Sequence, residues 1–297
     1  MKNETTGSTI RFLDRKPPQI PEQEVIRIAS DLYGLEVKCT PLSSERDANF
    51  RIDTDLGDSF ALKISNLNET PEDIDFQTRA LLHIEEQDPI FPIPRLVRNR
   101  EGETFTTIMT SHETHHLVHA LTFLPGLSMV EVPSTPAVWR NLGKTIARLD
   151  LALRSFFHPH ARRTHPWDLI RCTDLRPHTK TVSNRNARRN IEAVLDRMAA
   201  EVLTRVKTLR HQVIHADANP DNILVDAMNP DQIAGILDFG DMVYAPLIAE
   251  LAIAADLESV SSEQGLENLG ALVSGFDSML PLEEVEIDLL YDLILAR

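Results

Sequence analysis

The hydrophobic residues change their spacing soon after the chain begins. From Pro21 to Tyr33 they recur at helical intervals and Gly34 follows as a stop signal, which predicts a short helix. Beyond that helix polar and apolar residues alternate, and a polar turn at 55–58 separates two of the alternating runs. The strands expected on this basis are 37–42, 49–54, 59–64, 95–97, 104–109 and 118–124. The pattern predicts an antiparallel sheet.

A second helix is expected between the third and fourth of these strands. Thr70 stands at the N-cap position, Pro71 at the first helical position and Asp73 in the first turn. Periodic apolar residues follow, so this helix should pack on the sheet.

After Pro136 the pattern becomes helical, with amphipathic faces over 139–153 and 191–206. We place a boundary near residue 126. Residues 1–126 are predicted to form an N-lobe with a leading helix, an antiparallel sheet and one packed helix. Residues 127–297 are predicted to form a mostly helical C-lobe, so the expected fold class is α+β with two lobes.

Composition narrows the classes of function. The 297 residues are 42% hydrophobic, which is enough to build one large core or two modest ones. Cys39 and Cys172 lie far apart, which suggests neither a disulfide framework nor a zinc ribbon and favours a reducing, cytoplasmic setting. No apolar stretch approaches a membrane span, so we expect no membrane partner. A net charge of -15 argues against nucleic acid and suits a cationic small molecule.

The strongest chemical signal runs from Gln212 to Asp241. Two apolar, strand-like pieces flank a polar loop, and a further strand leads into Asp-Phe-Gly-Asp at 238–241. The pattern is H-x-D-x4-N followed by D-F-G, with each element at a strand end. Short clusters of Asp and Asn are often ordinary turn formers. The joint occurrence of all these elements in this order favours a functional site.

Phosphoryl transfer needs the residue types that this pattern supplies. It requires a carboxylate near the nucleophilic hydroxyl group and oxygen ligands for a Mg²⁺ ion that bridges the phosphates. We predict that Asp217 accepts or orients the hydroxyl proton and that Asn222 and Asp238 hold Mg²⁺. The amide of Asn222 offers a carbonyl oxygen without adding a charge beside Asp217, and Asp238 supplies the hard anion that Mg²⁺ prefers.

A nucleotide-binding element is then expected in the N-lobe. Lys63 is a lone cation within the apolar strand 59–64, from which it could contact the nucleotide phosphates as a point charge. An exposed strand lysine is the alternative. The connection that contains Ser43 and Ser44 could fold over the phosphates and offer backbone N–H and hydroxyl groups.

Two other segments match the residues of a known motif but lack the structural context or a residue that the motif requires. Residues 112–116 satisfy H-E-x-x-H, the zinc protease signature, but their context is strand-like where the motif needs a helix. We expect a polar hairpin connection there. Gly143-Lys144-Thr145 resembles the end of a phosphate-binding loop, but Val138 stands where that motif requires glycine.

At the positions singled out above, the chain resembles the aminoglycoside phosphotransferase and choline kinase superfamily, relatives of the protein kinases, and is most similar to the hydroxylysine kinase group. The matching segments cover 44–50, 62–64, 121–126, 166–169, 215–225 and 238–241. The resemblance implies a protein-kinase-like fold with two lobes, in which Thr122, Phe123 and Leu124 form the hinge against the purine. It also implies a kinase that transfers the γ-phosphate of ATP or GTP, with 5-hydroxy-L-lysine as the acceptor.

Three positions depart from the family pattern. Ala216 stands where the family usually has glycine, which we expect to be tolerated only if φ is negative. Gln77 best matches the helix acid that pairs with the strand lysine, and it can hydrogen-bond Lys63 but cannot neutralise it. Glu250 stands where an aspartate normally braces the catalytic loop, which begins at His215. The first two departures motivate a second hypothesis, a weakly active nucleotide-binding regulatory module.

A cationic acceptor entering a cleft needs an anionic partner to offset its desolvation. The candidates are Asp241 and Asp168, which accompany family-like motifs. Trp167 is expected either to line the acceptor pocket or to plug the core. Because acceptor pockets are assembled from distant loops, the sequence leaves hydroxylysine, aminoglycosides, choline and homoserine open as acceptors.

The last segment, 282–297, has helical spacing but no Gly, Asn or Pro to end a helix. One apolar face is marked by Val285, Leu289, Leu293 and Ala296. Similar kinases continue beyond this point with further helices. We therefore expect a truncated chain or the kinase part of a longer protein, with an incompletely covered apolar face on its last helix and a tendency to self-associate.

Overall fold

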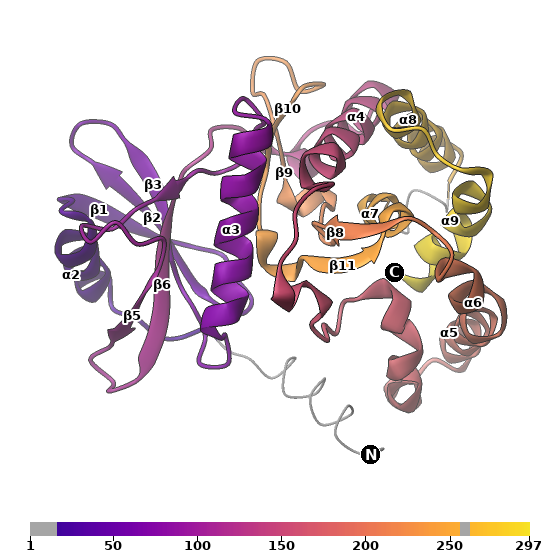
Figure 1. Ribbon diagram of the computed structural model, residues 1–297, viewed down its shortest axis with the longest axis horizontal. Helices are drawn as coiled ribbons and strands as arrows, with labels where there is room; N and C mark the ends of the chain where they lie inside the picture. Colours follow the sequence, from indigo (N-terminus) through magenta and orange to yellow (C-terminus); the bar gives the residue numbers. More distant parts are fainter. Residues whose placement is uncertain (1–16, 256–261) are drawn as a thin grey trace. The chain divides into compact units, whose positions relative to one another are not determined.

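The computed structural model describes residues 17–255 and 262–297 (Figure 1). The chain forms two compact units, which are described separately. Of the described residues, the first unit contains those up to Pro89 together with Ile93–Leu124, and the second contains the others.

The first unit is built on a six-stranded antiparallel sheet. Its strands follow the order β1-β2-β3-β6-β4, and β5 also pairs with β6. The elements are α2 (Glu22–Tyr33), β1 (Val37–Leu42), β2 (Ala48–Thr54), β3 (Ser59–Ile64), α3 (Pro71–Gln87), β4 (Leu96–Val97), β5 (Thr106–Met109) and β6 (His115–Thr122). Helices α2 and α3 lie on opposite sides of the sheet (Figure 1). The predicted sheet is confirmed.

Local sequence signals set both helices of this unit. Gly34 ends α2 in the left-handed conformation, with φ of 72°. At the start of α3, Thr70 and Asp73 form a reciprocal capping box. Buried residues of α2, including Val25 and Ile28, pack with sheet residues in one core. The predicted start and stop signals are confirmed.

The H-E-x-x-H segment connects β5 to β6. The Thr110 amide group donates to the Thr114 carbonyl at 2.9 Å, and Glu113 has a left-handed φ of 58°. This is the expected hairpin, without the helix that the zinc motif needs. Across the described residues, no three His, Cys, Asp or Glu side chains are grouped so that they could hold a metal by themselves.

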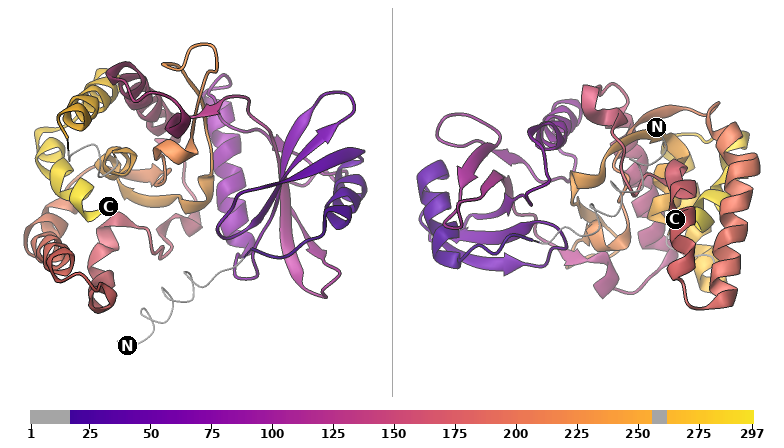
Figure 2. Two further views of the ribbon diagram at one scale, coloured as in Figure 1. Left: turned by 180° about the vertical axis from the view of Figure 1, so that it is seen from behind. Right: turned by 90° about the horizontal axis from the view of Figure 1, so that it is seen from below.

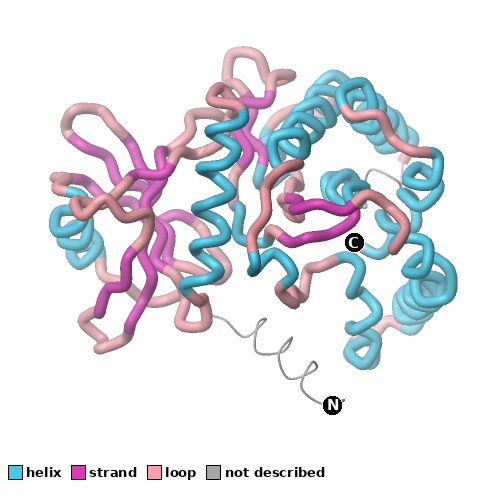
Figure 3. Tube along the Cα trace, in the orientation of Figure 1, coloured by secondary structure: helices cyan, strands magenta, loops and turns pink. Residues whose placement is uncertain are grey.

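The second unit is mostly helical (Figures 2 and 3). Its α-helices are α4 (Pro136–Leu153), α5 (Arg185–Arg197), α6 (Leu203–Val206), α7 (Leu247–Ala254), α8 (Glu263–Met279) and α9 (Glu284–Ala296). Its 3-10 helices are η1 (Met129–Glu131), η2 (Pro159–Arg162), η3 (Leu169–Thr181), η5 (Pro220–Asn222) and η6 (Phe239–Asp241), and η4 (Met198–Val202) is a π-helix. Together with the sheet of the first unit, these helices confirm the predicted α+β class.

Two small sheets position the polar loops of this unit. One has the order β10-β9-β7 and the other pairs β11 with β8. The strands are β7 (Leu127–Ser128), β8 (His211–Ile214), β9 (Ile223–Val225), β10 (Ile233–Ile236) and β11 (Val243–Pro246). The loop with the H-x-D-x4-N pattern joins β8 to β9, and the D-F-G segment joins β10 to β11.

Glycine allows α4 and α8 to pack closely (Figure 2). A Cβ atom on Gly143 would lie 2.0 Å from the Leu272 carbonyl oxygen, and one on Gly275 would lie 2.0 Å from that of Arg140. Gly143 is therefore a helix-packing residue, which gives the apparent phosphate-loop tripeptide a structural explanation.

Helix α9 is more fully packed than its sequence suggested. Leu289 and Leu293 are buried, Val285 and Ala296 are half-buried, and α7 packs against this helix. The expected incompletely covered face is therefore wrong at its two central positions. Arg297, which follows α9, places Nη2 3.3 Å from a carboxylate oxygen of Asp217.

In the part of the chain that the structure describes, no helix is both long and apolar enough to cross a lipid bilayer.

Candidate active site

The loop between β8 and β9 gathers amide groups around one carboxylate. Asp217 accepts a hydrogen bond from Asn219 Nδ2 at 2.7 Å through Oδ1, and one from Asn222 Nδ2 at 2.6 Å through Oδ2. Burial, followed by the charge of Asp241, raises the pKa of Asp217 to about 7. The loop therefore holds a positioned carboxyl group whose proton affinity suits proton transfer near neutral pH.

The backbone before this carboxylate is left-handed. Ala216 has φ of 63°, so the negative φ on which tolerance of its methyl group was expected to depend is not present. A residue with a Cβ costs roughly 1–2 kcal/mol in this conformation. Glu250 of α7 supports it, since its Oε2 accepts the N–H groups of His215 at 2.5 Å and Ala216 at 3.2 Å. Two hydrogen bonds donated to a fully buried carboxyl group hold the turn in which an alanine stands in place of glycine.

His215 links this loop to the strand end that precedes the D-F-G segment. Its Nδ1 accepts the Asp217 N–H at 3.2 Å, and its Nε2 donates to the Leu237 carbonyl at 2.9 Å. Burial lowers the pKa of His215 to about 4, so the ring is neutral. The ring packs edge-on against Phe239, with centroids 4.6 Å apart. His215 is therefore a neutral structural link.

The two predicted metal ligands come from loops that are hydrogen-bonded to each other, since the Leu237 N–H donates to the Asn222 carbonyl at 2.8 Å. Asn222 uses Nδ2 for Asp217, which leaves Oδ1 as its ligand atom. Asp238 has a left-handed φ of 58°, and its Oδ1 accepts the Gly240 N–H at 3.3 Å. Its charge also raises the pKa of Asp217, a repulsion that a cation would relieve. A carboxylate and an amide oxygen fit Mg²⁺, which fills its other positions with water and phosphate oxygens.

Arg163 and His165, which no sequence pattern singled out, contact the segment that follows the predicted metal ligand Asp238. Arg163 Nη2 donates to the carbonyl groups of Gly240 at 2.5 Å and Met242 at 3.1 Å. His165 Nε2 lies 3.3 Å from Asp241 Oδ1, and both side chains are buried. The candidate acceptor ligand Asp241 therefore has a partner inside the protein. No local pattern in the Pro-, His- and Arg-rich loop predicts these contacts.

The other two acceptor candidates lie at the start of η3. Asp168 caps this helix by accepting the Ile170 N–H at 3.3 Å, and burial raises the pKa of Asp168 to about 6. Trp167 is 40% exposed, so it is not a core plug.

In the first unit, Lys63 lies in the middle of β3. It stands directly opposite Asn49 of β2 and His119 of β6. Gln77 is buried on α3. Lys63 and Gln77 both belong to the unit predicted to bind nucleotide, and their roles there stay predictions.

In the connection that contains Ser43 and Ser44, and in the predicted hinge, side-chain hydroxyl groups accept backbone N–H groups. Ser44 Oγ accepts the Asp47 N–H at 3.3 Å, while the neighbouring Ser43 is exposed. Thr122 Oγ1 accepts the Arg95 N–H at 2.8 Å.

Phe123 donates its N–H to the Ser59 carbonyl at 3.0 Å, and the Arg51 guanidinium lies 4.6 Å from the Phe123 ring centroid. Leu124 is the last residue of the first unit. Phe123 is thus held next to the ends of β3 and β6 by both its backbone and its ring.

Comparison with known proteins decides the family. The profile described as "Phosphotransferase enzyme family" matches residues 38–282. The hydroxylysine kinase of Mus musculus is 31% identical over 303 aligned residues, which cover 94% of this chain and 80% of that protein. The chain belongs to the phosphotransferase enzyme family. This phosphotransferase is therefore a small-molecule kinase that acts on an alcohol group.

Solved structures share the fold of the phosphotransferase. The amicoumacin kinase hAmiN has a TM-score of 0.73 at 17% identity, over 93% of this chain and 83% of that one. A microcompartment-associated aminopropanol kinase has a TM-score of 0.66 at 18% identity, over 92% and 86%.

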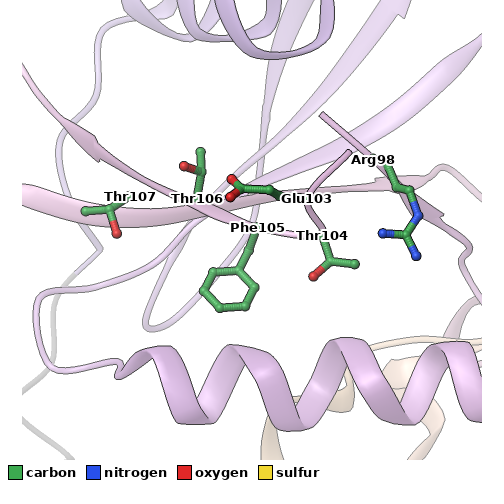
Figure 4. Close-up of a pocket in the computed structure, with 6 residues that line it drawn as sticks. All are labelled: Arg98, Glu103, Thr104, Phe105, Thr106 and Thr107. Carbon is green, nitrogen blue, oxygen red and sulfur yellow. The ribbon is translucent and has the colours of Figure 1, made fainter. Parts of the chain in front are cut away.

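A surface hollow of about 460 Å³ lies in the first unit (Figure 4). Its lining comes from β5 and the segment before it: Arg98, Glu103, Thr104, Phe105, Thr106 and Thr107. None of the residues predicted to bind nucleotide, metal or acceptor belongs to this lining.

The left-handed alanine gives a test of the loop geometry. We expect Ala216→Gly to raise the free energy of unfolding by roughly 0.5–1 kcal/mol, because glycine adopts positive φ without a Cβ clash. The control is Ala218→Gly in the same loop, whose backbone is not left-handed and which should lower stability. Urea unfolding of both variants checks this, and a destabilised Ala216→Gly variant would contradict the strain.

Proposed function

We propose that this phosphotransferase transfers the γ-phosphate of ATP or GTP to the hydroxyl group of an amino alcohol, with 5-hydroxy-L-lysine as the best candidate. The observation that carries the proposal is the Asp217 carboxylate, held by Asn219 and Asn222 next to the Asp238 loop. The relative named hydroxylysine kinase supports this acceptor. The structural neighbour named aminopropanol kinase supports the amino-alcohol class.

The chain's own residues account for the chemistry as follows. Asp217 accepts the proton of the acceptor hydroxyl group as that oxygen attacks phosphorus. The amide donors of Asn219 and Asn222 keep its carboxylate in one orientation. Lys63 would contact the nucleotide phosphates from the first unit.

Mg²⁺ held by Asn222 and Asp238 would neutralise charge on the phosphate oxygens. Support for a nucleotide with a divalent cation comes from amicoumacin kinase, which was solved with AMP-PNP and Ca²⁺. Magnesium rather than calcium is proposed because small, hard Mg²⁺ suits a site completed by phosphates.

The test is a screen of hydroxylated amines for nucleoside diphosphate release, with ATP and GTP as donors and with and without Mg²⁺. Hydroxylysine, aminoglycosides, choline and homoserine form the acceptor panel. Turnover with hydroxylysine above the others supports the proposal. Nucleotide binding without turnover on any acceptor would instead favour the regulatory module that Gln77 and Ala216 suggested.

For the acceptor ammonium group we expect Asp241 and Asp168 to supply the negative charge. Asparagine variants suit both positions, because Asn keeps the capping oxygen of Asp168 and removes only charge. We predict that Asp168→Asn and Asp241→Asn raise KM for hydroxylysine at least about tenfold with KM for nucleotide unchanged. The control is Asp174→Asn, an exposed acid paired with Arg171. An unchanged hydroxylysine KM in both variants would make the assignment wrong.

A further inference from the structure

Two carboxyl groups lie completely buried behind the catalytic loop. Asp150 is on α4 and Glu250 on α7, and both are 0% exposed. Glu250 uses Oε2 for the N–H groups of His215 and Ala216. Asp150 uses Oδ1 and its carbonyl group for the side chain of Gln212, at 3.3 and 2.9 Å.

The second oxygen of each carboxyl group takes no part in these hydrogen bonds. Asp150 Oδ2 and Glu250 Oε1 are buried and have no hydrogen-bond partner. A buried acceptor without a partner loses its hydration and gains nothing in return, so native proteins rarely leave one. A single proton would explain both oxygens. If one carboxyl group is protonated, its O–H can donate to the free oxygen of the other group.

The charges around the pair favour one bound proton. Burial, and then the charge of Glu250, raises the pKa of Asp150 well above its usual value. Burial also raises the pKa of Glu250 to about 7, with the charge of Asp217 adding to the rise. Arg210 and Arg154 act in the opposite direction on Asp150.

Neither arginine cancels the effect. Arg210 donates to Glu286 at 2.9 and 2.5 Å, so its charge is already matched. Arg154 is exposed. Two anions whose charges interact would therefore lie in a buried environment without a committed cation.

The hydrogen bonds decide which group keeps the proton. Glu250 accepts two backbone N–H groups through one oxygen, which stabilises its anion. Asp150 accepts one longer bond from a neutral side-chain amide. We propose that Asp150 is protonated at neutral pH and donates from Oδ2 to Oε1 of Glu250, which makes Asp150 a positioning residue for the catalytic loop.

The role in the reaction rests on the function proposed for Asp217. Protonated Asp150 holds Glu250, Glu250 holds the N–H groups of His215 and Ala216, and Asp217 follows directly. No proton leaves the pair during turnover. Asp150 therefore affects kcat only through the geometry of the loop.

The direct test is infrared difference spectroscopy in the carboxylic acid C=O region on the whole chain, wild type against Asp150→Asn. Wild type should show a protonated-carboxyl band that this variant lacks. If subtraction shows no such band from Asp150 at neutral pH, the proposal is overturned whatever the activity.

Stability against pH gives a second readout. A carboxyl group whose folded pKa exceeds its unfolded value binds more protons in the folded state, so its contribution weakens as pH rises from the unfolded value toward the folded one. Wild type should lose stability relative to Asp150→Asn as pH rises from about 4, the unfolded value for an aspartate, through neutral pH. Because Asp150 and Glu250 interact, the difference reports the loss of the proton that the pair shares. A pH-independent difference would contradict the proposal.

Kinetics tests the positioning role. Asp150→Asn keeps a donor toward Glu250 and should retain kcat, whereas Asp150→Leu has the size but no donor and should lower kcat by about 10²-fold with KM for nucleotide unchanged. The matched control is Asp196→Leu, an exposed acid paired with Arg176. Equal losses in Asp150→Asn and Asp150→Leu would overturn the positioning role. If wild type phosphorylates no acceptor, the proposed function fails, while the infrared band and the pH dependence still decide the protonation of Asp150.

Discussion

Replacing Asp217 by asparagine should abolish phosphoryl transfer and leave nucleotide binding intact. The carboxylate is placed to take the proton of the acceptor hydroxyl group, and an amide of the same size cannot. General base catalysis contributes about 10²–10⁴-fold, so kcat should fall by at least that range. The measurement is steady-state kinetics with the best acceptor, beside calorimetric titration of nucleotide.

The control for this substitution lies in the same loop. Asp221 is exposed, and its backbone N–H donates to Asn219 Oδ1. Asp221→Asn should therefore leave kcat within about twofold, in line with a surface change away from the site. If Asp217→Asn loses nucleotide affinity in step with kcat, the carboxylate serves the nucleotide rather than the acceptor and its assigned role is wrong.

What the sequence could predict depends on how local each signal is. The capping box at Thr70 and the left-handed stop at Gly34 are encoded within a few residues, so both helix ends were predictable. The H-x-D-x4-N and D-F-G elements are also local. Asp217 and Asn222 lie in one short loop between two strands, so their contact could be anticipated from their spacing alone.

Contacts between distant segments could not be read from the sequence. Arg163 and His165 hold the segment after Asp238 from a loop without periodicity, and Asp150 looks like one more polar residue on an amphipathic helix. The positive φ of Ala216 could not be predicted from the sequence for a related reason. The loop adopts the left-handed turn because Glu250, far along the chain, accepts the two amide hydrogens that the turn presents.

Replacing Asp238 should remove both metal dependence and nearly all activity. Its carboxylate is the anionic member of the predicted ligand pair, and without it the positive charge opposite the phosphates is lost. Two variants separate charge from backbone effects. Asp238→Asn preserves a residue type that tolerates the left-handed φ of 58°, whereas Asp238→Ala adds strain to the loss of charge.

Both variants should therefore lose Mg²⁺ binding, measured by calorimetry in the presence of a non-hydrolysable nucleotide, and both should lose kcat by several orders of magnitude. Only Asp238→Ala should also lower the free energy of unfolding, by roughly 1 kcal/mol, because alanine lacks a side chain that hydrogen-bonds locally in this conformation.

Asp226→Asn serves as the control, since this acid caps a surface turn by accepting the N–H groups of Met228 and Asn229. Magnesium-dependent turnover at the wild-type level in Asp238→Asn would make the metal assignment wrong, and a loss of activity confined to Asp238→Ala would place the role of Asp238 in the backbone turn.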